Sequence, residues 1–391
     1  MGITKYEVNK TKRVILIFGV LVFLLMLAPL PVVARIHNRT FGQRAESPAY
    51  RAFLRYDDVE SYARRVVNFP SGANMLTGYV YGEYNDKGLM VIAHSFGDGA
   101  EGYFNVIRYF VDMGWRVFAY DKTGSHNSEG RSTMGLLQSV LDLDAALIFI
   151  AAQDWGLPIV LFGHSWGGFA VTAILNFDHN IHAVVSLAGY NRPIQVLHDT
   201  ARTMFGRAGS LAYPYLWVHQ RILFGRDARL SAVSGVNNSD IPVMIIHGTE
   251  DALILYNSAG IIAHRYEIIN PNAVFVSRDL AHHNNHMNLL MTEDASVYID
   301  ELDEMFSDLL HHYLPQHHEY SCPFLTISYL HVNALANRNI SRCFCSRVYR
   351  AHLTDNVLSD FYAGIDRHRT SALDIPFMNE INAFFERALD S

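Results

Sequence analysis

The stretch VLFGHSWGGFA, residues 160–170, decides how this chain is expected to fold. It sets Ser165 between Gly163 and Gly167, after an apolar run typical of a buried strand and before residues that favour a helix. Side chains at the second position on either side of a tight strand-to-helix turn would clash, so both positions need glycine. Such a turn lifts the serine hydroxyl clear of the sheet, at the positive end of a helix. The stretch predicts a nucleophile; the alternative is a glycine-rich turn with a bystander serine.

Short apolar runs alternate with helical patterns through the middle of the chain. The expected strands span residues 88–94, 115–121, 157–164, 182–189, 241–248 and 272–278. Continuous apolar strands that alternate with helices predict an α/β fold, with a mostly parallel central sheet flanked by helices. Paired strands are expected before this sheet, around VNFPSG and LTGYVYG. Functional side chains in such folds gather at the carboxyl ends of the strands.

A serine hydroxyl is a poor nucleophile unless a base takes its proton, and a carboxylate must orient that base. The fifth of these strands is followed by Glu250 and Asp251. The sixth is followed by three histidines, His282, His283 and His286. The chain order serine, acid, histidine agrees with a nucleophile on a strand-to-helix turn.

Five motifs together resemble the α/β-hydrolase family, closest to bacterial serine hydrolases of esterase or peptidase type. They are AHSFGDG (93–99), YDKTGSHNSEG (120–130), GHSWGG (163–168), HGTEDALI (247–254) and the histidine-rich loop. The resemblance covers residues 66 to about 310 and implies an α/β-hydrolase fold. It assigns the acid to Asp251, with Glu250 as the alternative, because the family uses the aspartate of an H-G-x-x-D stretch. It assigns the base to His286, with His283 and then His282 as alternatives.

The resemblance also implies an oxyanion hole made of two backbone N–H groups. One belongs to Trp166, the residue after the nucleophile, and the other is placed at Phe96. Ser95 stands where the family has glycine, so Ser95 itself is a second candidate donor. Asp121 is expected to bond loop amides, and His126 is expected to line the pocket mouth or to face water.

Residues 190–238 join two strands without containing a strand, and their helical pieces predict a helical cap insertion. The cap carries Tyr213 and Trp217, which with Ser95 are the expected substrate-binding residues of a largely apolar acyl pocket. Packing of the cap on the core is the alternative for each aromatic residue.

Composition excludes several other classes of protein. The chain has 391 residues, of which 50% are hydrophobic and 18% charged, with a formal net charge of −7. No basic stretch interleaved with aromatic residues occurs, so nucleic acid is not an expected partner. The cysteines are Cys322, Cys343 and Cys345, whose spacing fits neither a disulfide scaffold nor a zinc site. No H-E-x-x-H occurs, nor a G-x-G-x-x-G after the first main strand, so we expect no metal and no cofactor.

The N-terminus places cations before an apolar run from 14 to 34, which is long enough to span about 30 Å. We expect a transmembrane signal anchor; a cleaved signal peptide and a buried core helix are the alternatives. Cations on the first side put residues 1–13 in the cytoplasm and the catalytic domain outside a cell membrane crossed once. Arg35, Arg39 and Arg44 on the far side weigh against that orientation. The cations before the run are Lys5, Lys10, Lys12 and Arg13.

These patterns divide the chain into six parts. They are a cytoplasmic tail (1–13), an anchor (14–34), a linker with a leading helix (35–65), a core (66–189 and 239–313), the cap (190–238) and a C-terminal extension (314–391). Residues 315–350 carry every cysteine and suggest no function.

The expected function is hydrolysis of a carboxylic ester, thioester or amide through an acyl-enzyme, on a small or lipid-like acyl substrate. A peptidase for short peptides is the first alternative, for which Asp98, Glu101 and Asp121 offer acidic groups to bind an amino terminus. A non-catalytic scaffold of the same fold is the second, although no member of the expected triad is missing.

Overall fold

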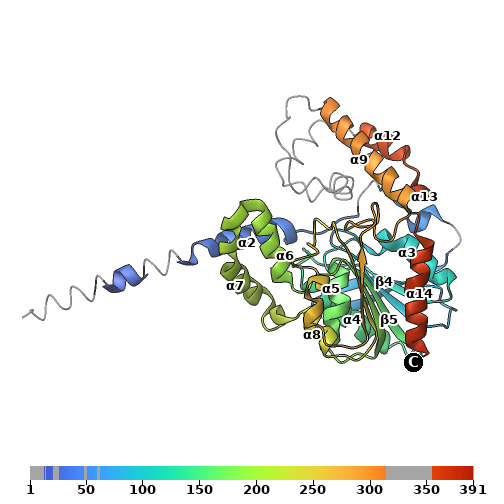
Figure 1. Ribbon diagram of the computed structural model, residues 1–391, viewed down its shortest axis with the longest axis horizontal. Helices are drawn as coiled ribbons and strands as arrows, with labels where there is room; N and C mark the ends of the chain where they lie inside the picture. Colours follow the sequence, from blue (N-terminus) through green and yellow to red (C-terminus); the bar gives the residue numbers. More distant parts are fainter. Residues whose placement is uncertain are drawn as a thin grey trace, which may run out of the picture.

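The computed structural model describes residues 13, 15–20, 26–47, 51–59, 62–313 and 355–390. An eight-stranded sheet forms the centre, in the order β1-β2-β4-β3-β5-β6-β7-β8 (Figure 1). Strand β2 runs antiparallel to β1 and β4, and all other neighbours are parallel. The strands are β1 (Arg64–Ser71), β2 (Asn74–Tyr81), β3 (Leu89–Ala93), β4 (Arg116–Tyr120), β5 (Ile159–His164), β6 (Ile181–Leu187), β7 (Val243–Gly248) and β8 (Ala273–Arg278).

Helices cover both faces of the sheet, which explains why its central strands are apolar throughout. Every residue of β3 is buried, as expected for a strand with helices above and below. One face packs on α4 (Gln138–Ala151), α5 (Trp166–Ala173) and α8 (Ala232–Asn237). The other packs on α3 (Phe104–Asp112) and α14 (Ile375–Leu389). This topology confirms the predicted α/β-hydrolase fold.

The predicted cap is helical. Between β6 and β7 the chain forms α6 (Pro193–Phe205), the 3₁₀ helix η4 (Gly206–Ala212) and α7 (Tyr213–Phe224) before α8. Helix α2 (Pro29–Phe41) packs against α7. A small apolar cluster joins the three helices through Val33, Ile194 and Leu216.

The N-terminal region differs from the expected linker and leading helix. Residues 35–41 continue α2, and residues 51–59 contain only a 3₁₀ turn, Tyr56–Asp58. The Asp58 carboxylate accepts the Arg55 N–H at 2.8 Å, which closes this short turn. The expected anchor (14–34) lies partly outside the described residues. Its last part differs from the expectation, because residues 29–34 begin α2, where Val33 is buried against the cap. Among those that are described, no helix combines the length and apolar character required to cross a membrane.

The C-terminal helix α14 is a layer of the core. Phe385 packs against Trp115 at 5.9 Å between ring centroids, and the Trp115 indole N–H donates to Asn382 at 2.8 Å. The chain reaches α14 through α9 (Glu293–Tyr313), α12 (Asp355–Ala363) and α13 (Arg367–Thr370). The core therefore draws on residues beyond the expected boundary at 313. Residues 315–350, for which the sequence suggests no function, lie outside the described residues.

Candidate active site

Ser165 occupies the turn between β5 and α5 in a strained backbone conformation. Its φ is 55° and its ψ is −110°, a region that side chains other than glycine rarely adopt. A Cβ at Gly167 would fall on the carbonyl oxygen of Ala93, and one at Gly163 on that of Gly167. The Ser165 N–H donates to the Leu187 carbonyl at 2.8 Å, which holds the turn against β6. The two glycines are therefore required by close backbone approach, and strain of this kind marks functional turns.

Asp251 and His286 form a buried hydrogen-bonded pair. His286 Nδ1 lies 2.7 Å from Asp251 Oδ2, while Asp251 Oδ1 accepts the N–H groups of Leu253 and Ile254 at 2.9 and 2.8 Å. Burial raises the pKa of the Asp251 carboxyl, but nearby His286 and hydrogen bonds from His247 and His286 outweigh burial and hold this pKa below its usual value. The carboxylate is thus charged and accepts the Nδ1 hydrogen, which leaves Nε2 of His286 as a proton acceptor.

His164 connects this pair to the turn. Its Nε2 lies 2.9 Å from the carbonyl oxygen of His286, and the two rings are 4.9 Å apart between centroids. A carbonyl oxygen only accepts, so Nε2 carries the hydrogen and Nδ1 accepts from the Tyr103 hydroxyl at 2.6 Å. Burial and the neighbouring His286 lower the pKa of His164 to about 3, which keeps the ring neutral. His164, one residue before Ser165, thereby fixes the His286 loop beside the turn.

The other acid and base candidates point elsewhere. His282 Nδ1 faces Asp300 at 3.8 Å, and His283 Nδ1 faces Asp374 at 3.9 Å. Glu250 is exposed. The structure therefore brings together Asp251 and His286, in a loop bonded to His164, the residue before Ser165, and separates the alternatives from this pair.

The expected oxyanion donors lie on neighbouring segments. Trp166 is the first residue of α5, where an N–H has no acceptor within its helix, and the Phe96 ring packs edge-on against Trp166 at 5.4 Å. Ser95 donates from its hydroxyl to Asp98 Oδ2 at 3.1 Å. The serine that replaces the family's glycine therefore has a partner within its own loop.

Lys122 is a site residue that sequence reasoning missed. It is fully buried, donates from its side-chain nitrogen to the His94 carbonyl, and lies 4.5 Å from the Trp166 ring centroid. Burial lowers the pKa of Lys122 well below its usual value, although Asp142 and Asp98 oppose this shift. Lys122 therefore ties together the two segments that carry the expected oxyanion donors. The signal in the sequence was a lysine directly after an apolar strand.

Two other predictions concern the loop after β4. Asp121 accepts the N–H groups of Ala100 and Asn127 at 2.9 and 3.1 Å, as expected for a carboxylate that bonds loop amides. His126 does not face water, because its ring is buried and Nδ1 lies 3.2 Å from the Arg51 guanidinium; that it lines the pocket mouth stays a prediction. The reason is that the segment before the sheet covers this loop.

That covering segment reaches the oxyanion loop. Phe41, at the end of α2, packs on Phe96 at 5.2 Å between centroids. Arg44 donates to the carbonyls of His126, Ser128 and Gly130 at 2.8, 2.9 and 2.7 Å. Residues upstream of the sheet therefore contact both the loop that carries Phe96 and the loop after β4.

The expected cap residues Tyr213 and Trp217 are both exposed on α7. Tyr213 packs edge-on against His198, and Trp217 lies beneath the Arg221 guanidinium. No described contact links either residue to Ser165, and their role in substrate binding stays a prediction.

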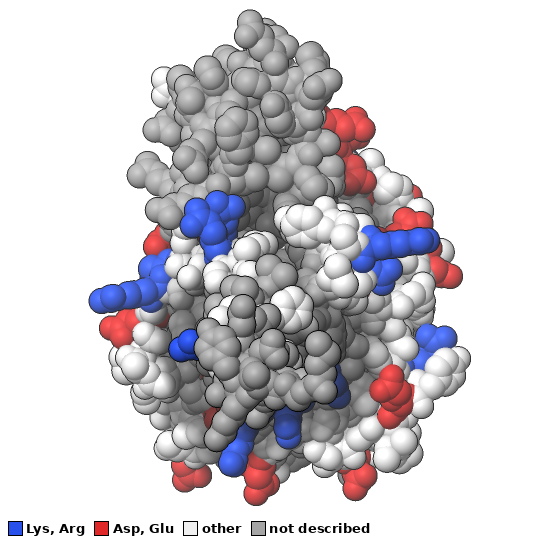
Figure 2. Space-filling model, turned by 90° about the vertical axis from the view of Figure 1, so that its left-hand side faces the viewer, with Lys and Arg blue, Asp and Glu red and all other residues white. Residues whose placement is uncertain are grey.

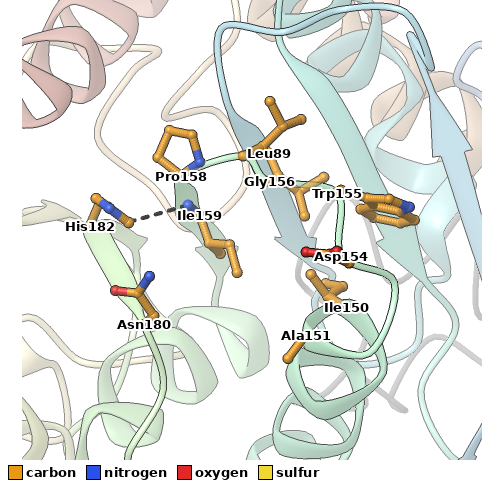
Figure 3. A pocket seen from close by; sticks show the side chains of 11 residues that line it. Leu89, Ile150, Ala151, Asp154, Trp155, Gly156, Pro158, Ile159, Asn180 and His182 are labelled. Atoms are coloured by element: carbon orange, nitrogen blue, oxygen red, sulfur yellow. Dashed lines mark hydrogen bonds between the residues drawn. The ribbon is translucent and has the colours of Figure 1, made fainter.

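A cleft of about 480 Å³ lies at the other end of the sheet (Figure 3). It opens at the amino ends of β3, β5 and β6, where Ile159 donates its N–H to His182 Nδ1 at 3.3 Å. Ser165, Asp251 and His286 follow the carboxyl ends of their strands, so the cleft is separate from the candidate active site. Its lining includes Leu89, Ile150, Asp154, Trp155, Pro158, Asn180 and His182.

The contact between α2 and α7 is expected to depend on pH. His37 packs against His219, with 4.7 Å between ring centroids, and burial together with His219 lowers the pKa of His37 to about 4. An undocked histidine titrates near 6.5, so the undocked form binds more protons between about pH 4 and 6.5. Docking of α2 is therefore fully stable above about pH 6.5 and weakens as pH falls through this window. Hydrogen exchange of residues 29–41 at pH 7 and pH 5 measures the effect.

His37→Phe is the control for that measurement, because it keeps an aromatic ring against His219 and removes the buried titrating group. Its protection should change less with pH than that of the wild type. If the protection of residues 29–41 depended equally on pH in both proteins, titration of His37 would not be the cause of the pH dependence.

Comparisons with known proteins found one family model and several similar solved structures. A family model described as serine aminopeptidase, S33, matches residues 84–229, which include Ser165 and end before Asp251. No curated protein matches the chain. An esterase from Pyrococcus furiosus is 18% identical, covering 69% of this chain and 99% of its own at a TM-score of 0.48.

Two further solved structures are similar to this chain at comparable levels. Est1E from Butyrivibrio proteoclasticus, with ferulic acid bound, is 18% identical over 62% of this chain and 99% of its own, at a TM-score of 0.45. An acylaminoacyl peptidase from Pyrococcus horikoshii is 15% identical over 59% of this chain and 38% of its own, also at 0.45. The chain has the α/β-hydrolase fold by its own sheet topology, and its residues 84–229 are similar to the serine aminopeptidase family model.

Proposed function

We propose that this chain is a serine hydrolase that cleaves a carboxylic ester, thioester or amide through an acyl-enzyme. The observation that carries the proposal is the buried hydrogen bond between Asp251 and His286, held by His164 beside the strained turn of Ser165. A charged carboxylate, a singly protonated imidazole and a serine on a tight turn are the three parts that acyl transfer requires.

In the proposed reaction, Ser165 Oγ attacks the substrate carbonyl carbon while its proton passes to His286 Nε2. Asp251 keeps the Nδ1 hydrogen oriented and stabilises the imidazolium that forms. The N–H groups of Phe96 and Trp166 bind the negative carbonyl oxygen. The bond to the leaving group breaks as that group takes the proton from His286. Water then attacks the acyl-enzyme, with His286 again as the base, and releases the acid.

An ester or thioester is favoured over a peptide by the partners of the acidic groups near the site. Glu101 pairs with Arg64 at 2.8 Å, Asp121 bonds loop amides, and Asp98 accepts from Ser95. Each of the three carboxylates would have to give up an existing partner to bind a substrate's amino terminus. The family model, which describes a serine aminopeptidase, keeps a peptidase as the second candidate. Turnover of aminoacyl anilides but not of nitrophenyl esters would favour it.

Labelling with a fluorophosphonate tests the nucleophile. The probe forms a phosphonyl ester on an activated serine with loss of fluoride, so the adduct should map to the peptide that contains Ser165. Ser165→Ala should remove labelling completely, because the probe reacts with an activated serine and Ser165 is the proposed nucleophile. Mass spectrometry of the digested protein identifies the modified residue.

Ser210→Ala is the matched control, since Ser210 is an exposed serine on the cap and its loss should leave labelling unchanged. Equal labelling of wild type and Ser165→Ala would reject Ser165 as nucleophile. A folded wild type that takes no label would favour the non-catalytic scaffold.

A membrane anchor in the part of the predicted run that precedes α2, and with it a location at the cell membrane with the catalytic domain outside, belongs to the same proposal. Its support is a run of exposed apolar side chains, Ile15, Leu16, Ile17, Phe18 and Val20. Added protease should digest the catalytic domain on intact cells that express the full chain. If that domain were fully protected on intact cells and digested only after lysis, it would lie inside the cell and the proposed orientation would be wrong.

A further inference from the structure

Helix α7 exposes large apolar side chains on the outside of the cap. Of its residues YPYLWVHQRILF, only Arg221 carries a fixed charge. Leu216, His219, Gln220 and Phe224 are buried against the rest of the protein. On the other side Trp217 is 49% exposed and Ile222 is 72% exposed. Since the outer face of a surface helix is normally polar, these exposed apolar side chains lack a partner among the described residues.

The apolar surface continues through the turn that precedes α7. Phe205 is 55% exposed, Leu211 74% and Tyr213 42%. Large side chains gathered in this way on neighbouring elements mark a surface that contacts another apolar phase. We call the exposed residues of this set, namely Phe205, Leu211, Tyr213, Trp217 and Ile222, the cap face.

The charge around the cap face is positive, although the chain is acidic overall. Residues 190–238 contain six arginines and two aspartates, a net charge of +4, whereas the whole chain carries −7. None of these arginines takes part in an ion pair within the part of the chain that the structure describes. Figure 2 looks onto this side of the molecule and shows acidic side chains mainly at its rim. A partner with negative charge is therefore favoured.

The chain leading to the cap is apolar as well. Residues 15–18 and 20 are exposed and apolar, as are Met26 and Leu27 immediately before α2. Helix α2 then packs on α6 and α7, and α6 and α7 lie on the side of the sheet from which this segment runs away (Figure 1). If an apolar phase such as a lipid bilayer covers residues 15–27, the packing of α2 on α6 and α7 holds the cap face close to that same phase.

We propose that the cap face docks on an anionic lipid bilayer. The apolar side of α7 would enter the boundary between headgroups and acyl chains, about 5–10 Å deep as amphipathic interfacial helices do. The arginines around it, Arg202, Arg207 and Arg226 among them, would pair with lipid phosphates. The proposal does not depend on catalysis, nor on whether the N-terminal segment spans the bilayer.

Trp217 provides a direct probe of this contact. The chain has four tryptophans, and Trp217→Phe gives the background from Trp115, Trp155 and Trp166. The full chain is reconstituted in vesicles of phosphatidylcholine with a minority of phosphatidylglycerol, with or without bromine on the upper acyl chains. The difference between wild type and Trp217→Phe isolates Trp217. Bromine should lower its fluorescence roughly twofold, since the ring would lie within the depth range of an interfacial helix.

Charge variants test the choice of an anionic partner. The triple variant Arg202→Gln, Arg207→Gln, Arg226→Gln should lose most of the bromine quenching of Trp217, and raised salt should weaken it in the wild type. The matched control is the triple variant Arg65→Gln, Arg108→Gln, Arg387→Gln. It removes the same charge from β1, α3 and α14, outside the cap, and its Trp217 should be quenched as in the wild type. Circular dichroism on heating verifies that both triple variants are folded.

Two outcomes would overturn the contact with lipid, and a third would overturn its anionic character. An unquenched Trp217 in protein that still sediments with the vesicles would place the cap face away from the lipid. An unquenched Trp217 in protein that crosslinks to itself would assign the cap face to a second copy of the chain. Equal quenching in vesicles of phosphatidylcholine alone would remove the anionic requirement and leave only an apolar contact.

Discussion

Ser165→Ala is expected to lower kcat by about 10⁶-fold, and His286→Gln by about the same factor. The two residues act as one unit, because the serine is a weak nucleophile without the base and the base has no task without the serine. The double variant should therefore be no slower than either single variant. The rate that remains would come from substrate binding and from the N–H groups of Phe96 and Trp166.

Asp251→Asn is expected to cost less, about 10⁴-fold in kcat. The amide can donate to His286 Nδ1 where the carboxylate accepts, so it favours the tautomer that lacks a free Nε2. Asp251 also accepts from Leu253 and Ile254, and Asn keeps an oxygen that can serve them. The variant should fold, and its loss should appear in kcat and not in the melting temperature.

Steady-state kinetics on a nitrophenyl ester measures all of these variants. His283→Gln is the control, since His283 lies in the same loop and faces Asp374 instead of Asp251. It should keep kcat within about threefold of the wild type, in line with the small effects of changes outside the site. A large loss in His283→Gln with activity retained in His286→Gln would transfer the base to His283.

Gly167→Ala is expected to prevent folding. The added methyl group would fall on the carbonyl oxygen of Ala93, with the His94 carbonyl 3.0 Å away, and both are backbone atoms beside a packed helix. A flexible side chain could move, but here strand β3 or helix α5 must shift. We expect a cost of about 5 kcal/mol or more, at the extreme of single substitutions. The total stability of a domain is only about 5–15 kcal/mol, so little folded protein should remain.

The control is Gly364→Ala, where the nearest atom to the new methyl group is a carbonyl oxygen at an ordinary 3.5 Å. Its unfolding free energy should change by less than about 0.5 kcal/mol. Soluble yield and denaturant unfolding compare the two variants. A Gly167→Ala protein with normal yield and a normal midpoint would refute the argument that close backbone approach requires this glycine.

Local patterns predicted the sheet and the Ser165 turn because their causes are local. An apolar run such as LMVIA indicates a strand that is buried on both faces of the sheet, and the glycines around Ser165 indicate a turn with no room for side chains. Asp251 and His286 follow strands, so the topology itself brings them to one edge. Their catalytic roles remain predictions, whereas their proximity is a property of the fold.

Contacts between distant segments were beyond sequence reasoning. Phe41 meets Phe96 across 55 positions, and Lys122 meets the His94 carbonyl through a loop whose path no periodicity encodes. His164 looked like a neighbour of the nucleophile, and its hold on the His286 carbonyl emerges only once both loops are placed. The expected leading helix failed for the same reason, since residues 51–59 follow the surface they cover.

The segment around Phe41 and Arg44, which covers the loop after β4, sets a limit on how far the chain can be shortened from its N-terminus. A shortened form that starts at Arg64 would retain all eight strands, yet it would lack Phe41 beside Phe96 and the three carbonyl contacts of Arg44. Removal of the apolar leader for expression in solution should therefore stop before Pro29. Low activity in a shorter form would then result from the loss of these contacts with the loops after β3 and β4, and would not show that the enzyme needs lipid.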